Sequence, residues 1–166
     1  IGSLTEASKY KQAFFVNGIG SSTNFWKKKS IIQKLMIPNE RFETIIHPTA
    51  SVSKLSKLGF GTVVFQNVTI ASNVKIGKHV IILPNSVICH DSLVGAYSCL
   101  TSGVIISGNV TVGESCYIGT NSAIIDNINI GNYCLIGMCS NVIKDVADNS
   151  VMVGNPASLS RKIIFN

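Results

Sequence analysis

The chain has 166 residues, of which 13% are charged and 46% hydrophobic, and its formal net charge is +6. This composition excludes a disordered chain and a coiled coil, and no apolar run approaches the ~20 residues that cross a bilayer. The positive charge fits a solvated surface or attraction to anionic ligands such as phosphorylated cofactors. Nucleic acid is disfavoured, because the lysines are scattered without interleaved aromatic residues.

Residues 1–45 predict a partial α/β, Rossmann-like unit. A short buried strand is expected at residues 13–16, a glycine turn at 17–20, an amphipathic helix at 23–36 and a second strand at 43–46. The glycine turn could hold a ligand or could simply end a strand. Because the sequence begins with Ile and not Met, we expect this unit to be truncated at its N-terminus.

A six-residue repeat begins at Ile46 and runs to Val142 without an insertion. Such a period predicts a parallel β-helix domain over residues 46–150, in which three hexads form one triangular coil and residues 46–146 supply five to six coils. The aliphatic position that points inward is occupied by Ile46, Val52, Leu58, Val64, Ile70, Ile76, Ile82, Ile88, Val94, Leu100, Ile106, Val112, Ile118, Ile124, Ile130, Ile136 and Val142.

Two further positions of each hexad have a predicted role. Four residues after the aliphatic residue comes a smaller inward position, which Cys116 and Cys134 share with Ser and Val. They are interpreted as core residues of a reduced, cytoplasmic protein. Glycine often follows the aliphatic residue, as at Gly59, Gly77 and Gly95, which suits a corner where a side chain would clash or φ would be positive.

Residues 151–166 are expected to form a C-terminal tail. Residues 153–157 predict a turn with a proline stop, and residues 159–165 predict either a terminal strand or a short helix.

The three histidines differ in what their positions predict. His47 is expected to be structural or on the surface, and His79 to be a solvated turn residue. His90 is followed by Asp91 and should point outward from a corner, where an imidazole beside a carboxylate could act as a general base. Nothing supports a metal site, because the histidines are far apart and no acidic cluster accompanies them.

Several segments resemble one family. Residues 87–95 (VICHDSLVG) resemble the catalytic segment of the sugar O-/N-acetyltransferases, the family of the sialic-acid O-acetyltransferases and bacillosamine-type acetyltransferases. Residues 108–113 and 116–123 resemble the coils that follow, and residues 153–157 the closing motif. The resemblance implies a left-handed β-helix and a homotrimer that uses acetyl-CoA. It also implies an acceptor amino or hydroxyl group on a nucleotide-linked or acidic sugar, as in polysaccharide biosynthesis.

The resemblance also implies roles for individual residues. His90 matches the catalytic base, and Asp91 the carboxylate that raises its basicity. Gly108 and Thr120 match positions that line the coenzyme cleft, and Met138 stands where a close relative has Gly.

Three further matches concern the acceptor. Gly18 and Ile19 match the sugar-nucleotide loop, and Cys99 takes the place of a second histidine nine residues after the base. The resemblance therefore implies substrate contacts for these residues.

Two other functions stay open. One is a hexapeptide acetyltransferase acting on serine or another small acceptor, although serine-specific members carry a long helical N-terminal domain that this sequence lacks. The other is a non-catalytic β-helix that serves as a scaffold or binding module.

Overall fold

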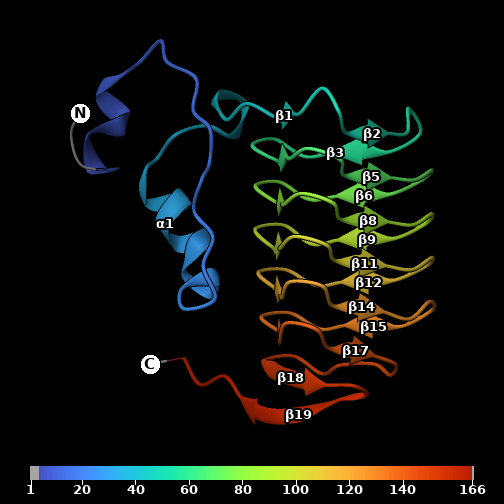
Figure 1. Ribbon diagram of the computed structural model, residues 1–166. Helices are drawn as coiled ribbons and strands as arrows, with labels where there is room; N and C mark the ends of the chain where they lie inside the picture. Colours follow the sequence, from blue (N-terminus) through green and yellow to red (C-terminus); the bar gives the residue numbers. More distant parts are fainter. Residues whose placement is uncertain (1–3, 166) are drawn as a thin grey trace.

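The computed structural model describes residues 4–165 as a parallel β-solenoid with an N-terminal arm along one side (Figure 1). Every predicted hexad between residues 45 and 142 contains one two-residue strand, and its second residue is the aliphatic one. The strands are β1 Ile45–Ile46, β2 Ser51–Val52, β3 Lys57–Leu58, β4 Val63–Val64, β5 Thr69–Ile70, β6 Lys75–Ile76, β7 Ile81–Ile82, β8 Val87–Ile88, β9 Leu93–Val94, β10 Cys99–Leu100, β11 Ile105–Ile106, β12 Thr111–Val112, β13 Tyr117–Ile118, β14 Ala123–Ile124, β15 Asn129–Ile130, β16 Leu135–Ile136 and β17 Asn141–Val142.

The strands form three sheets, one for each face of the prism. Each strand from β1 to β14 pairs in parallel with the third strand after it, 18 residues further on, so Ile46 lies beside Val64. The eight-stranded sheet has the order β1-β4-β7-β10-β13-β16-β18-β19, the six-stranded sheet β17-β14-β11-β8-β5-β2, and the five-stranded sheet β15-β12-β9-β6-β3. The predicted parallel β-solenoid is therefore confirmed.

The core of the solenoid consists of the two inward positions. The aliphatic residues from Val64 to Val142 are at most 4% exposed, and Cys116 and Cys134 are buried among them as predicted. Serines at the smaller position satisfy their hydroxyls on the backbone. For example, Ser92 Oγ donates to the carbonyl of Ser107 over 2.9 Å and accepts from the N–H of Val110. Small polar residues can therefore replace Val in this core without an unpaired hydroxyl.

The corner glycines are explained by close approach of the next coil. A Cβ on Gly95 would lie 2.4 Å from the carbonyl carbon of Gly113, and one on Gly77 would lie 2.5 Å from the nitrogen of Ala96. Positive φ occurs instead two residues later in the hexad, as at Asn73 (60°). Of the two explanations offered by the sequence, steric clash applies to these glycines.

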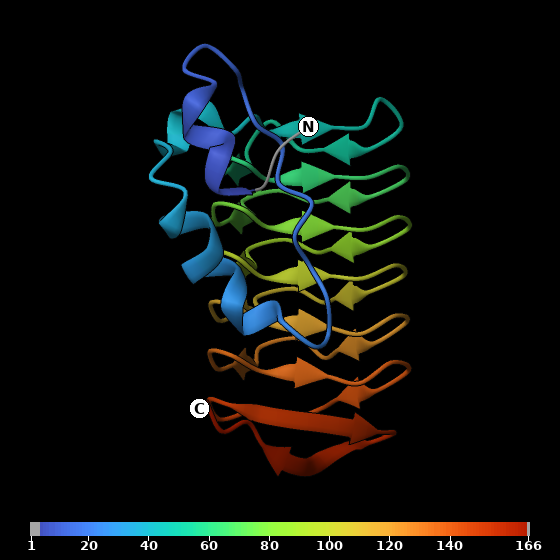
Figure 2. The same cartoon turned by 90° about the vertical axis from the view of Figure 1, so that its left-hand side faces the viewer.

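The N-terminal arm, residues 4–44, is less regular than predicted. It contains the 3₁₀ helices η1 Leu4–Lys9, η2 Phe25–Lys27 and η3 Asn39–Arg41 and a single α-helix, α1 Lys28–Lys34. The strand expected at residues 13–16 is present only as an isolated bridge between Phe15 and Phe42. In the second view, the arm crosses in front of the eight-stranded sheet (Figure 2).

The arm buries side chains that a bare solenoid would expose. On the outer face of the eight-stranded sheet, Ile81 is 6% exposed and Cys99 3% exposed. Phe25 packs 6.0 Å from the ring of Tyr117 and clusters with Val151 and Ile163 at the far end. The arm therefore contacts the solenoid from its first coils to its last.

His79 corrects a sequence prediction, because it is buried and not solvated. Its ring stacks on Tyr97 at 5.3 Å and meets Phe42 edge-on at 4.7 Å, while Nε2 lies 3.2 Å from Asn39 Oδ1. Burial, followed by the charges of Lys28 and a neighbouring lysine, lowers the pKa of His79 to about 4. The hexad pattern describes only the solenoid and could not reveal that the arm covers this corner.

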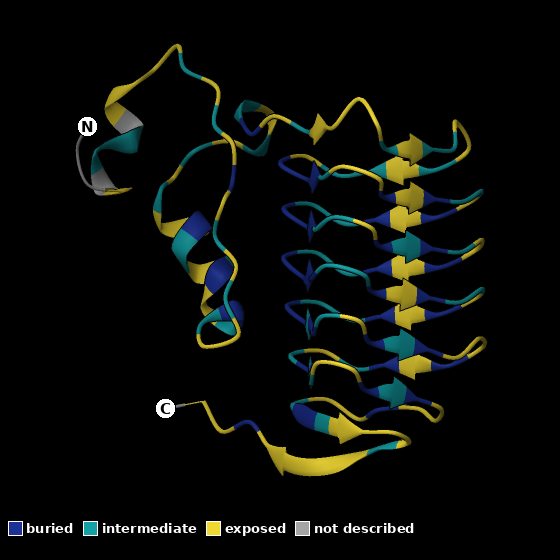
Figure 3. Cartoon of the chain, viewed as in Figure 1, coloured by how far each residue is buried: buried dark blue, intermediate teal, exposed yellow. Residues whose placement is uncertain are grey.

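The C-terminal tail is a hairpin of β18 Ser150–Gly154 and antiparallel β19 Ala157–Lys162, joined through a cis Asn155–Pro156 bond. Of the two predicted alternatives, the terminal strand is correct. The hairpin is mostly exposed, whereas the inward positions of the coils are buried (Figure 3). None of the helices in residues 4–165 is long and apolar enough to cross a membrane.

Candidate active site

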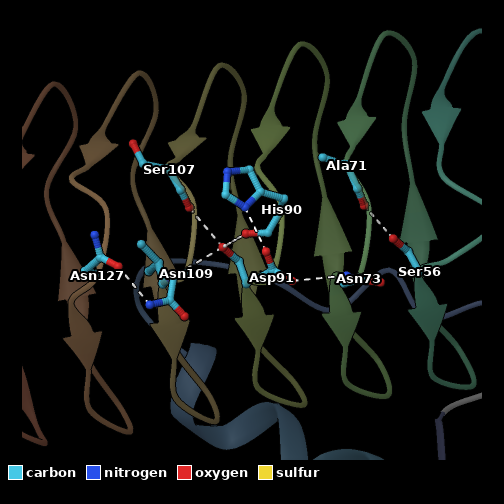
Figure 4. Close-up of polar contacts among 10 residues, drawn as sticks. Ser56, Ala71, Asn73, His90, Asp91, Ser107, Asn109 and Asn127 are labelled. Carbon is cyan, nitrogen blue, oxygen red and sulfur yellow. Dashed lines mark hydrogen bonds and ion pairs between the residues drawn. The ribbon is translucent and has the colours of Figure 1, made fainter.

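His90 and Asp91 occupy the corner between β8 and β9, where the six-stranded sheet gives way to the five-stranded one. Asp91 has a φ of 60°, which breaks the alternation of side chains along an extended backbone. As a result His90 Nδ1 lies 2.9 Å from Asp91 Oδ2 (Figure 4). The two side chains can thus act as a pair although they are adjacent in sequence.

The carboxylate of Asp91 is held from the other side by Asn73. Asn73 Nδ2 donates to Asp91 Oδ1 over 3.2 Å from the preceding coil. The hydrogen bond with His90, and then the bond from Asn73, lower the pKa of Asp91. An ionised carboxylate only accepts hydrogen bonds, so Nδ1 of His90 carries the proton and Nε2 is the basic nitrogen.

Gly108 lies against the imidazole from the following coil. A Cβ on Gly108 would be 2.7 Å from Cε1 and 2.8 Å from Nε2 of His90. The backbone N–H of Asn109 donates to the carbonyl of His90 over 2.9 Å, which fixes the two coils in register. The absence of a side chain at Gly108, which the resemblance predicts to line the coenzyme cleft, therefore leaves room for the ring of the candidate base.

Thr120 and Met138 lie at a different corner from His90. They follow β13 and β16 of the eight-stranded sheet and, with Ser22 of the arm, line a cavity of about 170 Å³. Thr120 Oγ1 donates to Thr101 Oγ1 over 3.2 Å, and the side chain of Met138 is exposed. Within one chain, the residues assigned to the coenzyme are thus divided between two corners.

Gly18 and Cys99 line a second cavity, of about 200 Å³, between the arm and the eight-stranded sheet. Ile19 lies beside Gly18 in an adjoining cavity of about 220 Å³. Burial raises the pKa of the Cys99 thiol. A buried thiol of raised pKa is a poor nucleophile, so the surroundings of Cys99 favour packing or contact over covalent chemistry.

Two features of the arm and solenoid were missed by sequence reasoning. The first is Lys28, which is fully buried although it is the middle one of three consecutive lysines, and its Nζ has no hydrogen-bond partner among the described residues. Burial lowers the pKa of Lys28 to about 8, and the electrostatic interaction with Cys99 is a smaller effect that raises it. The neighbouring Lys29 instead pairs with Glu114 at 2.7 Å. A run of three lysines carries no signal that its middle member is enclosed.

The second missed feature is a groove of about 510 Å³ on the outer face of the five-stranded sheet. We call this the lysine groove; it is lined by Leu55, Lys57, Asn73, Lys75, Asp91, Ser92, Leu93 and Thr111. It begins at the carboxylate that holds His90. Its two lysines stand 18 residues apart in the outward position of the hexad, a spacing that could have been read from the sequence. Residues 4–165 contain no group of three or more His, Cys, Asp or Glu placed to hold a metal ion.

No protein-family model matches the chain, and no curated protein sequence matches it. Solved structures do match. The acetyltransferase domain of PglB from Neisseria gonorrhoeae has a TM-score of 0.84 and 25% identity, over 94% of this chain and 75% of that one. PerB from Caulobacter crescentus, in complex with CoA and GDP-perosamine, has a TM-score of 0.83 and 27% identity, over 95% and 75%. WeeI from Acinetobacter baumannii has a TM-score of 0.77 and 26% identity, over 87% and 69%.

The resemblance to sugar acetyltransferases is confirmed. PerB is a GDP-perosamine N-acetyltransferase, and further structures of it carry alanine or asparagine in place of one histidine. A second structure of the PglB domain contains acetyl coenzyme A. Two of these neighbours, PglB and PerB, are therefore acetyltransferases whose structures contain acetyl-CoA or CoA, the coenzyme predicted from this sequence.

Proposed function

We propose that this chain is an acetyltransferase that moves an acetyl group from acetyl-CoA to an amino or hydroxyl group of a nucleotide-linked sugar. The observation that carries the proposal is the His90–Asp91 pair, held by Asn73 and seated on Gly108. It gives the solenoid an exposed, oriented imidazole at a corner. A scaffold would have no need of this arrangement, and the structural neighbours supply the reaction class.

In the proposed mechanism, the amine nitrogen or hydroxyl oxygen of the acceptor attacks the thioester carbonyl, and Nε2 of His90 removes the proton from that atom. The tetrahedral intermediate collapses with cleavage of the C–S bond, and the imidazolium returns the proton to the thiolate of CoA. Asp91 stabilises the imidazolium between these steps. General-base catalysis of this kind contributes roughly 10²–10⁴-fold to the rate.

The division of site residues between two corners leads us to propose a homotrimer. His90 and Gly108 lie at one corner, whereas Thr120 and Met138 lie at another. One coenzyme molecule that contacts both sets would have to lie between two copies of the chain.

We further propose that the solenoid is left-handed and that the protein is cytoplasmic. We also propose that the arm is part of a Rossmann-like unit, in which Gly18 and Ile19 contact the sugar nucleotide.

The test is release of free thiol from acetyl-CoA with a panel of nucleotide-linked amino sugars, with serine included as the rival acceptor. We expect His90→Ala to lose most of kcat while its binding of CoA is unchanged. His47→Ala is the matched control, because His47 is an exposed corner histidine whose Nδ1 lies 3.0 Å from Thr49 Oγ1. Turnover by His90→Ala close to that of the unmodified protein would disprove the assignment.

A further inference from the structure

Two lysines of the lysine groove form an unpaired cationic ladder beside the candidate base. Lys57 and Lys75 are direct partners in the parallel pair of β3 and β6, and both point outward. Like charges placed opposite each other on neighbouring strands are destabilising. Within residues 4–165 the ion pairs involve Lys9, Lys29 and His90, so neither ladder lysine has a carboxylate partner.

Among the described residues that line the lysine groove, Asp91 is the one with a carboxylate. Asp91 bonds to His90 through one oxygen and to Asn73 through the other. Asn73 and Asp91 both line the groove, and Figure 4 shows the hydrogen bond between their side chains. The remaining polar lining consists of neutral side chains, Ser92 and Thr111. Asp91 keeps its negative charge, but neither ammonium group forms an ion pair with it or with another carboxylate of residues 4–165.

We propose that Lys57 and Lys75 bind the diphosphate group of a substrate whose reacting end lies at His90. The inference rests on the proposed function. Adjacent strands are about 4.8 Å apart. Lys75 therefore stands one strand, and Lys57 two strands, above Leu93, which shares the coil of His90. Two cations at successive steps match two linked phosphates, and the step down to His90 leaves space on the scale of one hexose ring.

Two substrates of the proposed reaction carry a diphosphate, namely the sugar nucleotide and the coenzyme. The position of the two lysines along the solenoid does not show which of these two substrates they bind, so binding is measured for each. The probes are inorganic pyrophosphate, the nucleoside diphosphates GDP, UDP and dTDP, and CoA. The variants are Lys57→Met, Lys75→Met and the double variant, since Met keeps the unbranched stem and removes the charge. Lys34→Met, an exposed lysine on α1, is the matched control.

We expect each ladder substitution to weaken pyrophosphate binding by roughly tenfold, the effect of losing one charge-assisted hydrogen bond. Lys75→Arg should retain the binding, and Lys34→Met should leave it unchanged. Removal of like charge should leave thermal stability equal or higher, so loss of folding cannot account for the result. A loss confined to nucleoside diphosphates assigns the ladder to the acceptor, and a loss confined to CoA assigns it to the coenzyme.

Unchanged binding of every probe by the double variant would overturn the proposal. Dissociation of the native assembly in the double variant would also overturn it, because the lysines would then serve the contact between copies. The two proposals fail separately, since thiol release by the unmodified protein reports on acetyl transfer, whereas pyrophosphate binding reports on the lysine ladder alone.

Discussion

Gly108→Ala is the substitution that tests the candidate base most directly without removing it. The new Cβ would lie 2.7–2.8 Å from Cε1 and Nε2 of His90, closer than real Cβ atoms approach other heavy atoms. Gly108 does not have a positive φ, so alanine meets no backbone strain. Because the imidazole is 65% exposed, it can rotate away from the methyl group at little cost. We therefore expect the ring, and not the coil, to move.

The predicted outcome separates activity from stability. Displacement of His90 removes general-base assistance, so kcat should fall by about 10²–10⁴-fold. The melting temperature should stay level or rise slightly, since Gly→Ala at a compatible site stabilises by about 0.4–1 kcal/mol. For the melting temperature, Gly20→Ala is the control, because its Cβ meets Cys99 Sγ at an ordinary 3.4 Å.

Kinetics of thiol release and thermal melts measure both effects. The titration of Asp91, followed by NMR of its carboxyl carbon, adds a structural readout. Its pKa is lowered chiefly by the bond to His90 and should rise when that bond is lost. Turnover of Gly108→Ala equal to that of the unmodified protein would refute the placement of the imidazole on Gly108.

Two further predictions concern the contact between the arm and the solenoid. Lys28→Met should raise the free energy of unfolding by about 1–3 kcal/mol at pH 7, because the lowered pKa of about 8 reflects the cost of burying the ammonium group. Urea unfolding measures this, and substitution of the exposed Lys27 by Met should leave the free energy of unfolding unchanged. A Lys28→Met protein less stable than the unmodified one would contradict the reasoning. His79 has a folded-state pKa of about 4, below its usual value, so it binds a proton more readily in the unfolded chain. Stability should be fully present above about pH 6.5 and fall by up to about 3 kcal/mol as the pH drops to 4, and the pH dependence should be shallower in His79→Leu; equal acid sensitivity of the two proteins would count against it.

The solenoid could be predicted from sequence because its signal is repeated. Each hexad restates the same inward aliphatic residue, so an error at one position is corrected by the others. The same register placed Cys116 in the core and His90 at an outward corner. The pairing of His90 with Asp91 was expected only as a possibility, since it depends on a positive φ that no single residue type guarantees.

The arm could not be predicted with the same accuracy, because each of its contacts occurs once. His79 of the solenoid and Lys28 of the arm are both buried where the arm meets the solenoid. The residues next to them in the sequence do not predict this burial. Hydrophobic periodicity describes an element's own faces, whereas burial of these residues depends on which remote segment covers them. The lysine ladder was missed for another reason: its members look like ordinary surface lysines until the 18-residue coil places them side by side.

The arm also changes how the solenoid should unfold. Coils that touch only their neighbours form a one-dimensional array, in which the ends can melt while the middle stays folded. Here the arm contacts the solenoid at three levels. Phe42 packs at the first coils, and Lys29 pairs with Glu114 midway. Phe25 packs on Val151 of the terminal hairpin. Loss of either end would therefore strip contacts from the whole length. We therefore expect the arm and the coils to unfold together as one cooperative unit.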